Sequence, residues 1–135
     1  MAQTLTFLLM DPPYENARTT TALRLVDAAI RKGCNVNVFA YEGAVALAMK
    51  DQQPHANPVR GTTVEQEDHP TTRAFIAGLL ALAQEKGARL QWVNCGLCVD
   101  ERGAGNWIEG VRRGGPPDFL AMVEGSSNTL VIPTR

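Results

Sequence analysis

Residues 90–98 read Leu-Gln-Trp-Val-Asn-Cys-Gly-Leu-Cys, and this stretch is the most informative part of the chain. Leu90 to Asn94 is apolar enough for a buried strand, and it runs directly into Cys95. A helix is expected to begin there. A strand that turns into a helix at a reactive residue is typical of open α/β sheets, in which functional residues gather at the carboxyl ends of the strands.

Three more strands are predicted elsewhere in the chain. Their residues are nearly all apolar or alternate with polar ones, as expected for a sheet that helices cover. Their predicted ranges are Leu5–Met10, Asn35–Tyr41 and Thr129–Ile132.

Helical periodicity fills most of the segments between these strands. The two long helices are predicted from about Thr19 to Lys32 and from Thr71 or Thr72 to Gly87. Shorter helices are predicted over Ala44–Lys50 and, capped by Asp118, over Phe119–Val123. Because strands alternate with helices, we predict an α/β fold of three layers, a mostly parallel sheet flanked by helices on both faces.

Two polar stretches interrupt this pattern. Residues 51–70 contain three prolines and almost no large apolar residue, so we predict a long loop within one domain that spans residues 1–135. Residues 103–105 and 112–117 are rich in Gly and Pro and are predicted as turns.

Composition narrows the classes of partner. The formal net charge is −1, so no broad basic field is available for direct nucleic-acid or membrane binding. No apolar run approaches the roughly 20 residues that cross a bilayer, and Met1-Ala2-Gln3-Thr4 lacks the features of a signal peptide. We therefore expect a cytoplasmic protein whose partners are small molecules or other proteins.

The three cysteines favour reactive thiols over a disulfide framework, because their number is odd and the expected compartment is reducing. Cys95 and Cys98 form a CxxC pair at the predicted start of a helix. A helix start favours the thiolate, which is the form that attacks sulfur. Arg102, and Arg112 or Arg113 beyond it, are candidates for additional positive charge near Cys95.

Other interpretations of the cysteines have less support. Cys34 lies between a helix and a strand, where a buried packing role is expected. Cys98 is either an auxiliary or resolving thiol or an inward-facing core residue. A thioredoxin-like site lacks its usual aromatic residue, because Asn94 precedes Cys95. A zinc site would need ligands from Cys34, His55 and His69, which have no ligand spacing, so no metal or cofactor is predicted.

A second candidate site is the loop from Asp11 to Asn16, which follows the first strand. Tyr14 and Asn16 are candidate substrate-binding residues, together with Arg102. The same residues also suit an ordinary turn and helix cap.

Three stretches carry a resemblance to a known family. They are Pro13-Tyr14 followed by a helix ending at Arg31-Lys32-Gly33, then Val38-Phe39-Ala40-Tyr41-Glu42-Gly43, and then Val93-Asn94-Cys95 followed by Arg102-Gly103. In order and spacing, over nearly the whole chain, they resemble the DsrE/DsrF-like proteins, which include the TusD-type sulfur-relay subunits.

The resemblance implies a parallel sheet flanked by helices and a homo-oligomer, a trimer or hexamer. It also implies that Cys95 accepts sulfur as a persulfide from a donor protein or small sulfur compound and relays it to an acceptor. Cys98 has no counterpart in the TusD-type subunits.

Three functions follow as hypotheses. The first is a sulfur carrier or sulfurtransferase that uses Cys95. The second is a dithiol–disulfide redox protein that uses Cys95 with Cys98, and the third is a non-catalytic oligomeric binding or scaffold subunit.

Overall fold

The computed structural model describes residues 2–134 and contains a sheet of five parallel strands. Across the sheet the strands follow the order β4-β3-β2-β1-β5. Their bounds are Thr4–Leu9 for β1, Asn35–Ala40 for β2, Leu90–Cys95 for β3, Val111–Gly114 for β4 and Asn128–Ile132 for β5.

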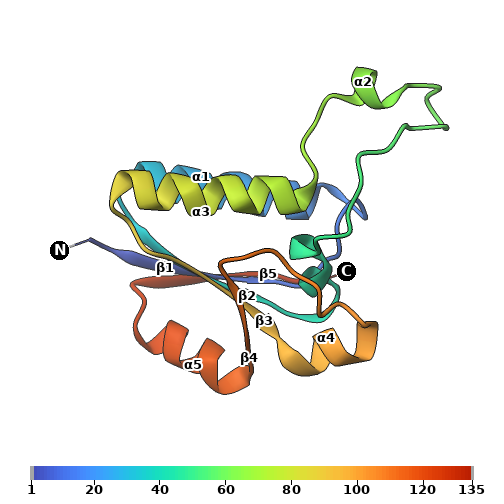
Figure 1. Cartoon of the computed structure of the whole chain (residues 1–135). Helices are drawn as coiled ribbons and strands as arrows, with labels where there is room; N and C mark the ends of the chain where they lie inside the picture. Colours follow the sequence, from blue (N-terminus) through green and yellow to red (C-terminus); the bar gives the residue numbers. More distant parts are fainter. Residues whose placement is uncertain (1, 135) are drawn as a thin grey trace.

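Helices cover both faces of this sheet, as Figure 1 shows. The long helices α1 (Ala17–Arg31) and α3 (Thr72–Lys86) lie on one face, and the shorter helices α4 (Gly96–Arg102) and α5 (Pro116–Glu124) lie on the other. The predicted three-layer α/β fold is confirmed.

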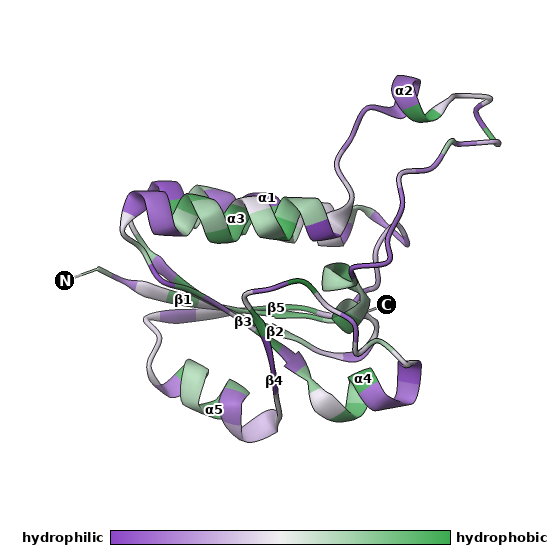
Figure 2. Cartoon of the chain, in the orientation of Figure 1, coloured by the Kyte–Doolittle hydropathy of each residue, from purple (hydrophilic) through white to green (hydrophobic). Residues whose placement is uncertain are grey.

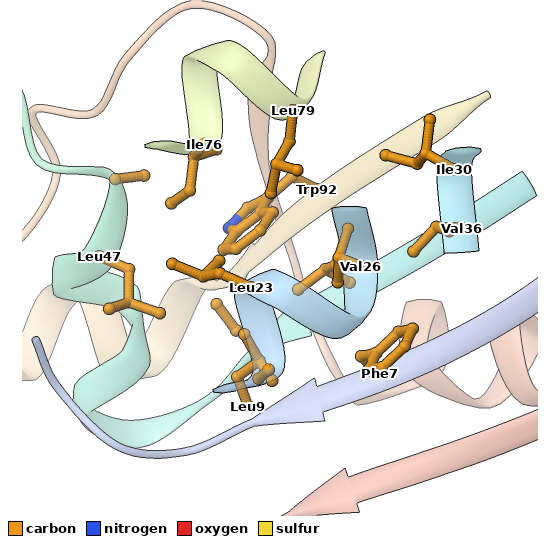
Figure 3. Packing of buried hydrophobic residues seen from close by; sticks show 14 of the residues in the cluster. Phe7, Leu9, Leu23, Val26, Ile30, Val36, Leu47, Ile76, Leu79 and Trp92 are labelled. Carbon is orange, nitrogen blue, oxygen red and sulfur yellow. The ribbon is translucent and has the colours of Figure 1, made fainter. Parts of the chain in front are cut away.

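The larger core lies between the sheet and the helices α1 and α3 (Figure 3). Each long helix presents a stripe of apolar residues at helical spacing to the sheet. The side chains buried there include Phe7, Leu23, Val26, Ile30, Val36, Ile76, Leu79 and Trp92. Burial of each such side chain contributes roughly 1.5–3 kcal/mol, so this layer holds α1 and α3 on the sheet.

A smaller core lies under α4 and α5 and includes both cysteines of the CxxC pair. Phe39 and Val93 project into it from the sheet, and Val99 and Met122 project from the two helices. Phe119 packs on Phe39, with ring centroids 5.5 Å apart. This second core fixes α4, and therefore the CxxC pair, against the ends of β2 and β3.

The strand β4 corrects the prediction of a turn at residues 112–117. Val111-Arg112-Arg113-Gly114 pairs in parallel with β3, and Cys95 lies opposite Gly114. An edge strand is stabilised by backbone pairing on one side and tolerates charged residues. The sequence of β4 is therefore polar and does not show the apolar pattern that predicts a strand.

The cap of α5 also differs from the prediction. The helix begins at Pro116, and Asp118 lies within its first turn. Its carboxylate reaches back to accept a hydrogen bond from the Gly115 N–H at 2.8 Å. Asp118 therefore caps the helix from inside, because Gly115 has no side chain with which to do so.

Two short helices lie between β2 and α3. The segment predicted as a helix over Ala44–Lys50 is the 3₁₀ helix η1 (Glu42–Ala48). The stretch at 51–70, called the arm below, extends away from the sheet and carries mostly hydrophilic residues (Figures 1 and 2). It contains the helical turn α2 (Val64–Glu67), which was not predicted.

Candidate functional site

Cys95 lies at the junction that the sequence predicted. It is the last residue of β3 and the N-cap residue of α4, and its backbone is extended, with φ −62° and ψ 120°. The side chain is only 3% exposed. The thiol therefore lies within the smaller core, at the carboxyl end of β3.

Cys98 lies one helical turn further on and is buried in the same core as Cys95. The backbone N–H of Glu42 donates a hydrogen bond to Cys98 Sγ at 3.2 Å. Burial, and then the neighbouring Cys95 thiol, raise the pKa of Cys98 to about 11. At neutral pH the Cys98 thiol is therefore protonated.

The end of β2 contributes two residues that were not selected as site residues. Glu42 has a left-handed backbone, with φ +51°, which directs its N–H at Cys98. Tyr41 precedes it, and the charge of Glu42, followed by that of Cys98, raises the Tyr41 pKa. The only sequence signal for these two residues is the Tyr-Glu-Gly motif that follows β2. Glu42 and Cys98 are far apart along the chain, so the sequence gives no sign that they are in contact.

Arg102, a predicted site residue, lies beside Glu42. Its guanidinium pairs with the Glu42 carboxylate at 2.7 Å and donates to the Cys98 carbonyl oxygen at 3.3 Å. Arg102 thus connects the end of α4 to the end of β2.

The two arginines of β4 have different neighbours. Arg113 forms two hydrogen bonds with Asp100 of α4, at 3.0 and 2.7 Å, and its guanidinium lies over Gly96. Arg112 pairs with Asp118 of α5 at 3.2 Å. Of these two, Arg113 is the arginine that lies beside the start of α4.

Tyr14 and Asn16 lie in other surroundings. Tyr14 contacts the arm, with its ring centroid 5.2 Å from that of His55 and 6.4 Å from that of His69. Asn16 caps α1 by accepting a hydrogen bond from the Arg18 N–H at 2.8 Å. Within residues 2–134 neither forms a hydrogen bond with Cys95 or Cys98, so their proposed substrate contact stays a prediction.

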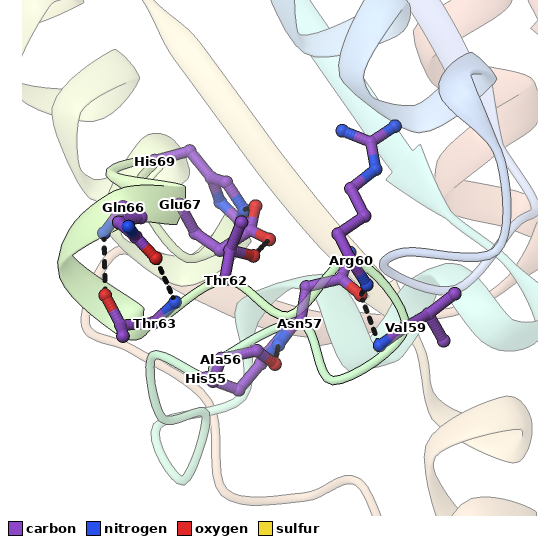
Figure 4. Close-up of polar contacts among 10 residues, drawn as sticks. All are labelled: His55, Ala56, Asn57, Val59, Arg60, Thr62, Thr63, Gln66, Glu67 and His69. Atoms are coloured by element: carbon purple, nitrogen blue, oxygen red, sulfur yellow. Dashed lines mark hydrogen bonds and ion pairs between the residues drawn. The ribbon is translucent and has the colours of Figure 1, made fainter.

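The arm has polar contacts of its own, shown in Figure 4. Thr63 and Gln66 exchange backbone-to-side-chain hydrogen bonds at 2.9 and 3.2 Å, which explains why α2 forms. His69 lies 3.6 Å from a Glu67 carboxylate oxygen. Over the described residues, no three His, Cys, Asp or Glu side chains are grouped to hold a metal ion.

Cys34 is buried in the larger core, on the opposite face of the sheet from the CxxC pair. No helix in the described part of the chain is both long and apolar enough to span a bilayer.

These features define a class of protein: an all-parallel α/β sheet with a buried cysteine pair where β3 passes into α4. The model of the DsrE/DsrF-like family matches residues 3–132, and the chain belongs to that family. The predicted family resemblance is confirmed, and family membership indicates a function in sulfur relay in general terms.

Two curated relatives match nearly end to end. An uncharacterized protein of Methanocaldococcus jannaschii, MJ0989, is 31% identical over 129 residues, covering 94% of this chain and 97% of its own. An uncharacterized protein of Methanopyrus kandleri, MK0008, is 29% identical over 128 residues, covering 93% and 91%.

A solved structure shows the same fold. The crystal structure of the ychN protein from E. coli superposes with a TM-score of 0.69 at 19% identity. The superposition covers 96% of this chain and 98% of ychN.

Proposed function

We propose that this chain is a cytoplasmic sulfur carrier or sulfurtransferase, in which Cys95 holds sulfane sulfur as a persulfide and passes it to an acceptor thiol. The observation that carries the proposal is the Cys95–Cys98 pair at the carboxyl end of β3. Family membership supports a function in sulfur relay, and the geometry of the pair supports Cys95 as the residue that carries the sulfur.

The chemistry needs no external oxidant. The Cys95 thiolate attacks the sulfane sulfur of a donor, R–S–SH, and the R–S⁻ thiolate leaves, which yields Cys95–S–SH. In the second step an acceptor thiolate attacks the terminal sulfur. A persulfide then forms on the acceptor, and Cys95 leaves as its thiolate.

Cys98 has a supporting role in this scheme. With a pKa of about 11, it remains a neutral thiol one helical turn from Cys95. The Glu42 N–H holds Cys98 in this place.

The burial of Cys95 favours small donors. A side chain that is 3% exposed is reached more readily by a polysulfide than by a cysteine on a folded protein. A protein donor or acceptor would require α4 to move away from the end of β3.

The test is intact-protein mass spectrometry after exposure to polysulfide, with peptide mapping. We expect a gain of one or more sulfur atoms on Cys95 that a reductant removes. Cys95→Ser should abolish this gain, and Cys34→Ser is the matched control because Cys34 lies in the other core. Loading that survives in Cys95→Ser would refute the assignment.

The dithiol–disulfide function is a second candidate, favoured by the position of both thiols in one core, one turn of α4 apart. It predicts a loss of two hydrogens and a reversible link from Cys95 to Cys98. The raised pKa of Cys98 opposes it, because few Cys98 thiolates exist at neutral pH to complete the disulfide.

We also propose a homo-oligomer, a trimer or hexamer. Leu97 and Leu120 are 69% and 60% exposed on the two helices that cover the smaller core, so both side chains are available for a contact between subunits. Light scattering should give three or six times the chain mass of 14.6 kDa, and a monomer mass would refute this.

A further inference from the structure

The helix α4 covers both cysteines of the CxxC pair. Cys95 is 3% exposed and Cys98 is 5% exposed, whereas Leu97 on the outer side of the same helix is 69% exposed. A molecule larger than a small polysulfide therefore reaches either thiol only after this cover has opened.

The apolar contacts that hold α4 are few. The helix has seven residues, of which Gly96, Cys98 and Val99 are buried. The helix α1, by comparison, buries six of its 15 residues, among them Leu23 and Ile30. Segments with few buried apolar contacts open locally more often than the rest of a protein. Polar contacts at the flanks of α4 therefore matter for keeping it closed.

One set of polar contacts joins α4 to the end of β2. Arg102, the last residue of α4, pairs through Nη2 with the Glu42 carboxylate at 2.7 Å and donates from Nη1 to the Cys98 carbonyl oxygen at 3.3 Å. The backbone N–H of Glu42 donates to Cys98 Sγ at 3.2 Å. Glu42 thus holds the end of the helix with its carboxylate and the sulfur with its backbone.

The opposite flank of α4 is joined to β4. The Asp100 carboxylate accepts two hydrogen bonds from the Arg113 guanidinium, at 3.0 and 2.7 Å. The start of α4 is also continuous with β3 through Cys95. If the Arg102–Glu42 pair separates, these contacts keep α4 attached while it moves away from β2.

We propose that the Arg102–Glu42 ion pair is a latch that holds α4 closed over Cys95 and Cys98 and so limits which molecules reach the two thiols. That the latch selects small sulfur donors over protein donors rests on the proposed function, whereas its effect on access to the thiols does not.

The exposure of the pair indicates how strong the latch is. The side chains of Arg102 and Glu42 are 33% and 40% exposed, so water screens their attraction. Removing either charge should increase the opening of α4 by about two- to fivefold, as for other ion pairs of this exposure.

The first measurement is amide hydrogen exchange of the full chain, followed by mass spectrometry of peptides that cover α4. Arg102→Gln and Glu42→Gln should each speed exchange in α4 about two- to fivefold, and Glu42→Gln keeps the backbone N–H that contacts Cys98. The double variant should show no further increase, because both changes break the same pair. Arg102→Lys should restore part of the protection, since it keeps the charge.

The matched control is Glu101→Gln. Arg102 also lies 3.5 Å from the Glu101 carboxylate, but Glu101 is on α4 itself, so that contact cannot fasten the helix to β2. The control removes one carboxylate beside the same arginine, and exchange in α4 should not become faster.

The second measurement is the rate at which N-ethylmaleimide labels Cys95 at one fixed pH, with the label assigned by peptide fragmentation. Arg102→Gln should make this labelling faster. Loss of a nearby positive charge disfavours a thiolate, so a faster rate reports better access and not a change in ionisation.

Faster exchange in both single variants, without addition in the double variant and without change in Glu101→Gln, would support the latch. Unchanged exchange in Arg102→Gln, fully additive effects, or faster exchange without faster labelling of Cys95 would overturn it. Because neither measurement uses a sulfur donor, the outcome is separate from the loading test: a chain that fails to load sulfur can still show the latch.

Discussion

Replacing Gly96 with alanine should displace the Arg113 guanidinium from the start of α4 at almost no cost in stability. The added Cβ would lie 2.6 Å from Arg113 Nε, closer than real Cβ contacts allow. The obstacle is the flexible, half-exposed end of a side chain, so the guanidinium can swing away. Alanine in a helix is favoured over glycine by up to about 1 kcal/mol, so the free energy of unfolding should stay within about 1 kcal/mol of wild type.

The assay is urea unfolding of the variant beside the wild-type chain. The matched control is Gly78→Ala in α3, where nothing lies within 4 Å of the added Cβ. It should add about 0.5–1 kcal/mol of stability. A loss of several kcal/mol in Gly96→Ala would refute the reasoning, because it would mean that the guanidinium cannot move aside.

Three further predictions concern the elements that hold the site. Gly114→Ala should lower the free energy of unfolding by about 1–3 kcal/mol in urea titrations, because its Cβ would lie 2.5 Å from buried Val93; wild-type stability would contradict this. Leu79→Ala should cost about 2–5 kcal/mol in the same assay, since this side chain is 2% exposed under α3, and a change below 1 kcal/mol would argue against that packing. The Gly115 N–H, and then Arg112, lower the pKa of Asp118 below its ordinary 3.8. The stability that this shift contributes is complete above pH 3.8 and is lost as the pH falls through the lower pKa of the folded state. Asp118→Asn should therefore make the fall in stability at acid pH, measured by circular dichroism, less steep. An unchanged fall would contradict this.

Most of the fold could be predicted from periodicity. The apolar runs of β1, β2 and β3 and the helical stripes of α1 and α3 are local patterns, and each was predicted to within two residues at either end. The edge strand β4 could not be predicted in this way. Its sequence, Val-Arg-Arg-Gly, does not alternate between apolar and polar residues. The segment is a strand because its backbone pairs with that of β3.

The candidate site was predictable only in part. Cys95 lies at a strand-to-helix junction that the sequence predicts, and Cys98 follows one helical turn later. Glu42 and Arg113 could not be assigned, because each reaches the site from a different strand end. Asp118 was predicted as the residue that precedes and caps its helix, but it lies inside the first turn. The sequence does not distinguish the two cases, because an Asp near a helix start can cap the helix from either position.

Local periodicity and the order of short motifs were enough to establish the α/β class, the family and the position of Cys95. The groups that surround the thiol are set by contacts between distant parts of the chain. The order of the strands brings the ends of β2, β3 and β4 together, so that Glu42 contacts Cys98 and Arg113 lies on Gly96. Contacts between residues far apart in the chain depend on strand order and packing, and short motifs do not encode them.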